Sequence, residues 1–185
     1  PLVKYAQTSD ALSMIKNKLN TDTIESRMVA FLCADGVEGA SVNNMKSALE
    51  KAGATVKIIG TNSTAVKTAE GKELKVDHNL LTVSSVLFDA IFIPAGQQSV
   101  NELKEEDKIS EFLNDTYKHC KVIGAERDGI DLLNEVDFIS TLSEMKLIEH
   151  GIIINDEEHN DNFANDFIAA MGQHRFWIRE KPLKN

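Results

Sequence analysis

The sequence has few cysteines, no long apolar run and no stretch rich in basic residues. Its two cysteines, Cys33 and Cys120, lie in or beside apolar segments, so we expect buried free thiols in a reducing cytoplasm. The longest apolar runs are well short of the roughly 20 residues that a membrane span needs. The 20 basic and 29 acidic side chains give a net charge of −9. This charge argues against nucleic acid or an anionic membrane as a partner.

The sequence shows no internal repeat or low-complexity segment, and we expect no signal peptide. The first residue is Pro1, and we therefore expect a processed chain or a part of a longer one. Residues 1–27 differ from the rest. We predict that they form a linker arm outside the core, with a short helix whose apolar residues are Ala11, Leu12, Met14, Ile15 and Leu19. We expect residues 28–185 to form one folded domain.

Apolar segments of strand and helix type alternate along this domain. Strands are predicted at residues 28–33, 55–59, 90–93, 121–125 and 151–154. Helices are predicted at residues 42–52, 109–120 and 160–171. Two further helices are predicted to begin near Val100, with Ser99 or Asn101 as the cap, and at Ile130. A strand, a helix and a second strand form a right-handed parallel crossover unit. The sequence therefore predicts an α/β protein, a flavodoxin-like three-layer α/β/α sandwich with a mainly parallel sheet.

Two segments depart from this alternation. The short alternating runs 66–69 and 74–76 flank Glu-Gly-Lys at residues 70–72, which predicts a small β-hairpin off the main sheet. Residues 77–85 are interpreted as a connection. The apolar residues of 174–178 are expected to pack back onto the sheet.

The carboxyl ends of parallel strands form the site in this architecture, and three turns would meet there: 35–41, 94–98 and 126–129. The last is a strand-to-helix elbow, the place of a nucleophile on related sheets. It contains Glu126, Arg127 and Asp128 but no Ser, Cys or Thr. Glu126 is thus the only candidate nucleophile in the expected position, and a salt-linked or solvated turn is the favoured interpretation.

Phosphate and metal sites have little support. Neither 35–39 nor 94–96 matches a phosphate loop. The acidic segment 155–161 lacks the ligand spacing of a calcium loop. His119 and Cys120 are neighbours on a predicted helix and do not face each other. We expect no metal or cofactor in this chain.

Several stretches together resemble one known family. They read Ser9-Asp-Ala-Leu-Ser-Met14, Arg27-Met-Val-Ala-Phe-Leu-Cys-Ala-Asp-Gly-Val-Glu-Gly-Ala40, Ser85-Val-Leu-Phe-Asp-Ala90, Tyr117-Lys-His-Cys-Lys-Val-Ile-Gly124 and His174-Arg-Phe-Trp177. In this order and spacing they resemble the C-terminal domain of large-subunit haem catalases. That domain belongs to the ThiJ/PfpI superfamily, relatives of the class I glutamine amidotransferases.

The resemblance implies a domain that has lost the superfamily's active site. Glu126 stands where active members carry the nucleophilic cysteine, and Ser41 stands where they carry a glutamate, three residues after the position matched by Glu38. Ala95-Gly96 replaces their Gly-Gly turn, so all these positions are interpreted as vestigial. Losing a positioned acid or base alone typically costs about 10²- to 10⁴-fold in rate.

The family also implies a function. This chain would be a non-catalytic domain that aids assembly or stability of a cytoplasmic, tetrameric haem catalase, a parent that decomposes hydrogen peroxide. Its partner would be the catalase core of the same chain, which would hold the haem. Two alternatives stay open: a stand-alone ThiJ/PfpI-type enzyme or chaperone that uses Glu126 or Cys33, and a small-molecule receptor domain.

Overall fold

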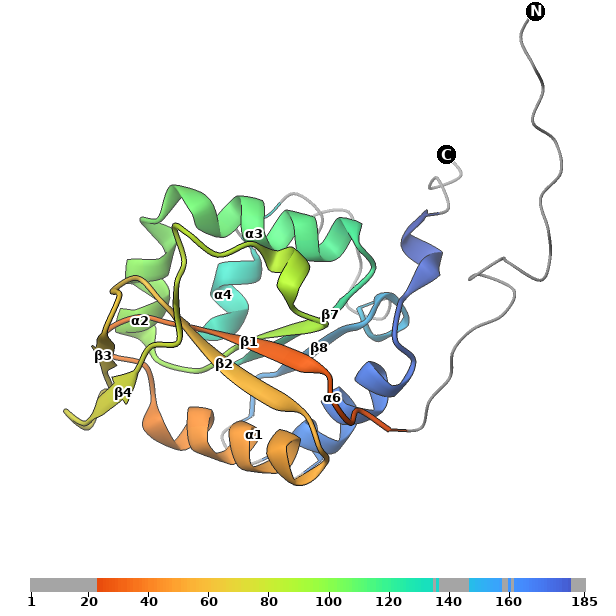
Figure 1. Ribbon diagram of the computed structural model, residues 1–185, viewed down its shortest axis with the longest axis horizontal. Helices are drawn as coiled ribbons and strands as arrows, with labels where there is room; N and C mark the ends of the chain where they lie inside the picture. Colours follow the sequence, from red (N-terminus) through yellow and green to blue (C-terminus); the bar gives the residue numbers. More distant parts are fainter. Residues whose placement is uncertain (1–22, 135, 137–146, 158–159, 161, 181–185) are drawn as a thin grey trace, which may run out of the picture.

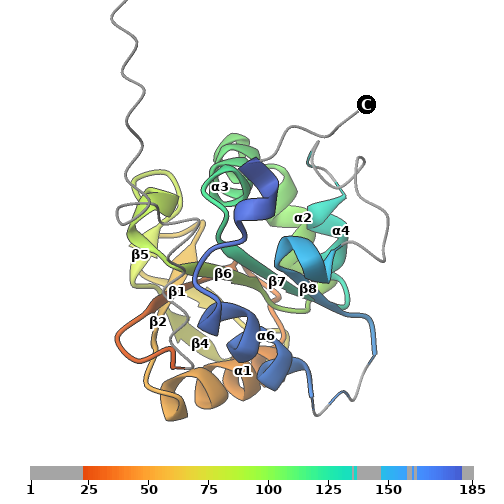
Figure 2. The same ribbon diagram turned by 90° about the vertical axis from the view of Figure 1, so that its right-hand side faces the viewer.

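The centre of the molecule is a six-stranded sheet in the order β5-β2-β1-β6-β7-β8. Figure 1 labels β1, β2, β7 and β8, and Figure 2 also labels β5 and β6. The computed structural model describes residues 23–134, 136, 147–157, 160 and 162–180. The strands are β1 (Met28–Cys33), β2 (Thr55–Gly60), β5 (His78–Asn79), β6 (Ala90–Ile93), β7 (Val122–Glu126) and β8 (Ile152–Asn155). Every pairing between them is parallel, which confirms the predicted α/β class.

Helices cover both faces of the sheet (Figures 1 and 2). One face carries α1 (Gly39–Lys51) and α6 (Phe163–Gly172), and the other carries α2 (Gln97–Lys104), α3 (Asp107–Lys118) and α4 (Gly129–Leu133). Short 3-10 turns lie at η2 (Ser85–Leu87), η4 (Ile148–His150) and η5 (Trp177–Glu180). Within the described residues, no helix is both long and apolar enough to cross a bilayer.

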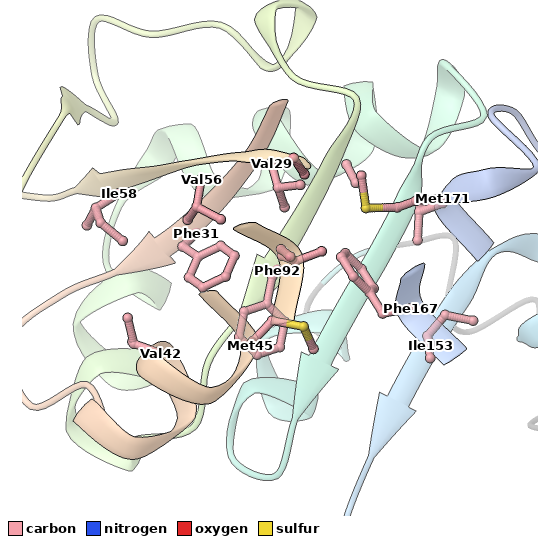
Figure 3. Packing of buried hydrophobic residues seen from close by; sticks show 14 of the residues in the cluster. Val29, Phe31, Val42, Met45, Val56, Ile58, Phe92, Ile153, Phe167 and Met171 are labelled. Carbon is pink, nitrogen blue, oxygen red and sulfur yellow. The ribbon is translucent and has the colours of Figure 1, made fainter. Parts of the chain in front are cut away.

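Each central strand sends alternate side chains to the two faces. On β1, Val29 and Phe31 join the cluster under α1 and α6, whereas Ala30 and Leu32 join the cluster under α2, α3 and α4. Phe31 meets Phe92 of β6 edge to face with ring centres 4.8 Å apart, and Figure 3 shows both rings among their apolar neighbours. Burial on both faces explains why these strands read as continuous apolar runs.

The predicted hairpin is confirmed as a separate antiparallel pair, β3 (Ala65–Lys67) and β4 (Glu73–Lys75). It lies against the turn that follows β1, because the amide of Gly36 donates to the Lys67 carbonyl at 2.7 Å. The carboxylate of Glu70, in the hairpin turn, accepts from the Gly39 amide at the start of α1 (3.2 and 3.3 Å). An anion at this end is favoured by the helix dipole. The hairpin thus borders the region where the three predicted turns meet.

Two predicted elements differ from the structure. Residues 77–85 were expected to be a connection, but β5 lies within them and extends the sheet beyond β2. A two-residue polar strand has no alternation that a pattern could detect. Helix α2 begins at Gln97, earlier than predicted, and Ser99 does not cap it. The Ser99 hydroxyl instead accepts from the Ala34 amide at 2.9 Å, inside the protein.

The ends of the chain also differ in part. Ile24 belongs to the arm that was expected to lie outside the core, yet it is 1% exposed and packs within the α1 and α6 cluster. A hydrogen bond from the Ser26 amide to the Gly53 carbonyl holds this segment against the domain. Near the other end Phe176 is buried as expected, whereas Ile178 is 42% exposed. The predicted helix near residues 11–19 lies outside the described residues.

Candidate functional site

The three turns predicted to form the site do come together at the carboxyl ends of the strands. The Glu38 amide donates to the Ala95 carbonyl at 2.8 Å, which joins the turn after β1 to the turn after β6. These two strands are neighbours from which the chain runs outward in opposite directions, the switch point where such sheets bind ligands. The elbow after β7 completes the group through side-chain contacts with both other turns.

Gly96 allows the first two turns to approach this closely. Its φ is +132°, a conformation that side-chain-bearing residues rarely adopt. A Cβ atom at this position would lie 2.5 Å from the Gly36 carbonyl oxygen and 2.9 Å from the Glu38 amide nitrogen. Backbone therefore packs directly on backbone here, and the geometry of the site depends on this glycine.

Glu126, the predicted vestigial nucleophile position, ends β7 and is held by neutral donors. The Ser41 hydroxyl donates to its Oε2 at 2.5 Å, and the Asn155 side-chain amide donates to its Oε1 at 3.4 Å. Ser41 also accepts from the Ala95 amide at 3.1 Å. The serine thereby links two of the residues that sequence analysis selected, Glu126 and Ala95.

The strained position of the elbow is occupied by Arg127, the residue after Glu126. Arg127 has a φ of +46°, and its amide donates to the Asn155 carbonyl at 2.6 Å. Its guanidinium pairs with the carboxylate of Glu38. The Arg127 Nε is buried and has no acceptor among the described residues.

Asp128 satisfies the other backbone amide of the turn after β6, because its Oδ2 accepts a hydrogen bond from the Gly96 amide at 3.0 Å. Both backbone amides of the predicted vestigial oxyanion turn are therefore occupied, Ala95 by Ser41 and Gly96 by Asp128. Oxyanion stabilisation needs such donors to be aimed at the reacting group. In this structure they are engaged by the protein's own side chains.

A cavity of about 560 Å³ opens beside these contacts. Its lining includes Glu38, Ser41, Glu126 and Arg127 from the contacts described above. The other lining residues come from α1, α6 and the segment before α6, and are Ala40, Asn44, Met45, Asn160, Phe163 and Ala164.

Neither cysteine lines this cavity. Cys33 lies in β1 with no exposed surface, and burial raises the pKa of its thiol well above the usual range. Cys120 is 1% exposed, and burial likewise raises its pKa, although Arg179 opposes the shift. Both thiols are free, as predicted. A nucleophilic thiol requires the opposite shift, toward the thiolate, so Cys33 is badly placed for the catalytic role considered above.

Metal ligands do not gather in the described part of the chain, where no group of three His, Cys, Asp or Glu side chains could hold an ion. Part of the acidic segment 155–161 lies outside the described residues. Within this segment the Asn155 side chain is 3% exposed and forms hydrogen bonds with the Glu157 backbone, in addition to its contact with Glu126 at the elbow.

Sequence reasoning identified Glu38, Ser41, Glu126, Ala95 and Gly96, and the structure brings all five into one region. Sequence reasoning did not identify the residues that these five contact. The Arg127–Glu38 pair agrees with the favoured interpretation of a salt-linked turn, but the partners of Arg127 and Asp128 in other turns were not named, and Asn155 was not considered as a donor. An arginine between two acidic residues, facing a turn that holds Glu38, was the available signal for the ion pair.

Comparison with known proteins gives the family. The C-terminal domain found in long catalases matches this chain over residues 25–181. The chain belongs to this family. Catalase HPII of Mycobacterium avium is 34% identical over 185 residues, covering 94% of this chain and 25% of the relative. Catalase-2 of Bacillus subtilis is 33% identical over 176 residues, with 95% and 24% covered. The chain thus spans about a quarter of the length of these relatives.

Solved structures agree on the fold of this catalase C-terminal domain. Oxidized DJ-1 of Toxoplasma gondii superimposes with a TM-score of 0.62 at 16% identity, covering 79% of this chain and 88% of that one. DJ-1beta of Drosophila melanogaster gives 0.61 at 18% identity, with 83% and 93% covered. At such identities the likeness concerns the fold alone, and it confirms the ThiJ/PfpI-like architecture.

Proposed function

We propose that this chain is the non-catalytic C-terminal domain of a large-subunit haem catalase and aids assembly or stability of the parent. The parent would be a cytoplasmic tetramer that decomposes hydrogen peroxide. Support comes from the family match over residues 25–181 and from relatives that are named catalases and are about four times as long.

The non-catalytic character rests on the contacts at the elbow. The elbow position is occupied by the Glu126 carboxylate, which already accepts a hydrogen bond from Ser41. The Ala95 and Gly96 amides donate to Ser41 and Asp128. A substrate would have to displace these internal acceptors before either amide could stabilise developing charge. Each displacement would replace a hydrogen bond that the protein already makes with one to the substrate, so little net stabilisation would be gained.

We place the haem in the catalase core. The cavity beside the elbow has no Tyr, His or Cys in its lining, and these are the side chains that usually hold haem iron from the proximal side. Charged groups from Glu38, Glu126 and Arg127 surround it, which suits a macrocycle poorly. The residues that line this cavity therefore do not fit haem.

The partner of this domain would be the catalase core of its own chain, repeated in a homotetramer. The cytoplasmic assignment is supported by the two cysteines, both free and buried, because disulfides mark oxidising compartments. The net charge of −9 disfavours nucleic acid as a partner.

The first experiment uses the 185-residue chain alone. We expect neither a haem Soret band after incubation with haemin nor turnover of hydrogen peroxide. Esterase, glyoxalase and aggregation-suppression assays run in parallel. An activity that disappears in Glu126→Gln or Cys33→Ser would favour the stand-alone enzyme or chaperone instead.

The second experiment uses the long catalase with and without this domain. Removal should leave turnover per haem unchanged but shorten the lifetime of the tetramer on heating, which is measured as a rate of irreversible inactivation. The full protein carrying Glu126→Gln is the matched control and should behave as wild type. An unchanged inactivation rate after removal of the domain would contradict the assembly role.

A further inference from the structure

The amino ends of the strands hold another cavity, of about 250 Å³, at the opposite end of β7 from the elbow. The chain around the end of α3 and the start of β7 supplies Lys118, His119 and Lys121. Arg175, just before η5, and Trp177, its first residue, supply further side chains. Four basic side chains thus surround one small space on a protein with a net charge of −9.

Lys121 is the most deeply placed of these groups and is 4% exposed. Its ammonium donates to the Ser85 carbonyl at 2.8 Å. An ammonium carries three donors, so one carbonyl satisfies only part of it. Among the described residues no carboxylate forms a salt bridge with Lys121.

The nearby carboxylates have other cations as partners. Asp89 lies 3.8 Å from Arg175, and Asp115 lies 3.9 Å from Lys118. The exposed Glu180 also lines the cavity and opposes part of its positive charge. Lysine is rarely buried without a paired anion, because the lost hydration is not recovered.

We propose that this cavity binds a small oxyanion of the phosphate type, with Lys121 as its innermost contact and Arg175 beside it. Lys118 and His119 are exposed and would reach the ligand from the rim. Trp177 and Val86 form an apolar wall. Charge-assisted hydrogen bonds from ammonium and guanidinium groups are the strong contacts for such an anion. This inference does not depend on the function proposed for the domain.

The single tryptophan of the chain gives a local probe, because Trp177 lies in the wall of this cavity. The 185-residue chain is titrated with inorganic phosphate at constant ionic strength, maintained with sodium chloride, while tryptophan emission is followed. We expect a saturable change with a dissociation constant on the order of 1 mM. Lys121→Met should weaken binding roughly tenfold or more, as expected for loss of a hydrogen bond to a charged group.

Two lysines of α3, the exposed Lys118 and the half-exposed Lys108, give a matched test and control. Lys118→Gln, at the cavity rim, should weaken binding about two- to fivefold. Lys108→Gln removes the same charge from the same helix, but Lys108 pairs with Glu111 at 2.7 Å and does not line the cavity, so affinity should be unchanged. A parallel titration with acetate distinguishes a phosphate site from one that accepts any carboxylate, including a side chain of another protein.

The proposal is wrong if phosphate causes no saturable change, or if Lys121→Met binds phosphate as tightly as wild type. It is also wrong if Lys108→Gln loses as much affinity as Lys118→Gln, since binding would then reflect net charge alone. Circular dichroism shows whether Lys121→Met folds. If it does not, the double variant Lys118→Gln/His119→Asn decides the question, because both side chains are exposed.

Discussion

Charged side chains are paired differently at the two ends of the same sheet. At the carboxyl ends, Glu38 is paired with Arg127, Glu126 accepts from Ser41, and Asp128 accepts from a backbone amide of the neighbouring turn. At the amino ends, Lys121 is almost fully buried with a backbone carbonyl as its acceptor. The carboxyl end therefore pairs its carboxylates internally, although the Arg127 Nε has no acceptor among the described residues, whereas the amino end holds an ammonium with a single acceptor.

This difference shows that position in the fold does not by itself identify the end that can bind a ligand. Parallel sheets usually bind at the carboxyl ends, where loops and helix N-termini converge. Here the donors of that region are occupied by Ser41 and Asp128. The amino end lacks those conventional features, yet it contains Lys121, a buried cation that forms no salt bridge within the described residues.

The largest effect that would test this comparison is expected from Gly96→Ala. The new Cβ would lie 2.5 Å from the Gly36 carbonyl oxygen, and alanine is strained at a φ of +132°. Strain and overpacking together should lower the free energy of unfolding by about 4 kcal/mol, measured by urea denaturation.

Gly71→Ala provides the control for Gly96→Ala. Gly71 also has a left-handed φ, +79°, in the hairpin turn, but a Cβ there would meet nothing within 4 Å. Only the conformational cost remains, about 1 kcal/mol. Equal losses for the two glycines would mean that the contact between the first two turns does not hold the elbow region together.

A smaller effect is expected from Ser41→Ala. The change removes one donor from Glu126 and leaves the fully buried Ala95 amide without its acceptor. An unsatisfied buried donor should cost about 2 kcal/mol of unfolding free energy. Ser63→Ala, an exposed serine that accepts one long bond of 3.4 Å from Asn79, should cost much less. If Ser41→Ala were neutral, the claim that the elbow end pairs its carboxylates internally would fail.

The sequence predicted the sheet well because its strands are buried on both faces. Continuous apolar runs such as residues 28–33 and 90–93 mark such strands without ambiguity once helical segments separate them. The edge strand β5 has only His78 and Asn79, and two polar residues show no period. The start of α2 was misjudged because Ser99 resembles a cap, whereas it bonds to β1.

The candidate site was predicted in position but not in its contacts. Topology alone brings Glu38, Ser41 and Glu126 together, because the three turns lie at the same end of the sheet. Which side chain meets which depends on rotamers and on the left-handed conformation of Arg127, and neither is visible in a residue pattern. The burial of Lys121 was equally hidden, since a lysine at the start of a strand usually lies in solvent.

The smallest effect is expected at the amino end, in the pH dependence of stability. Burial, with a contribution from Arg175, lowers the pKa of Lys121 from 10.5 to about 8, while Asp89 and Asp115 oppose the shift. Below about pH 8 native and unfolded chains both carry the charge, so the cost of burying it is fully present. Between about pH 8 and 10.5 the unfolded chain binds more protons, and stability should rise with pH through this group, by an amount on the order of 1 kcal/mol.

Comparison of wild type with Lys121→Met isolates this contribution. Burial raises the pKa values of Cys33, Cys120 and Tyr117, which lowers stability with rising pH, but these groups are present in both proteins and cancel in the difference. The free energy of unfolding of wild type relative to Lys121→Met should therefore increase from pH 8 to 10, whereas Lys108→Gln should follow wild type. Saturating phosphate should stabilise the ammonium and move the onset of the increase to higher pH. A difference that is flat with pH, or an onset that phosphate does not move, would mean that the charge of Lys121 is already compensated and that the two ends of the sheet do not differ.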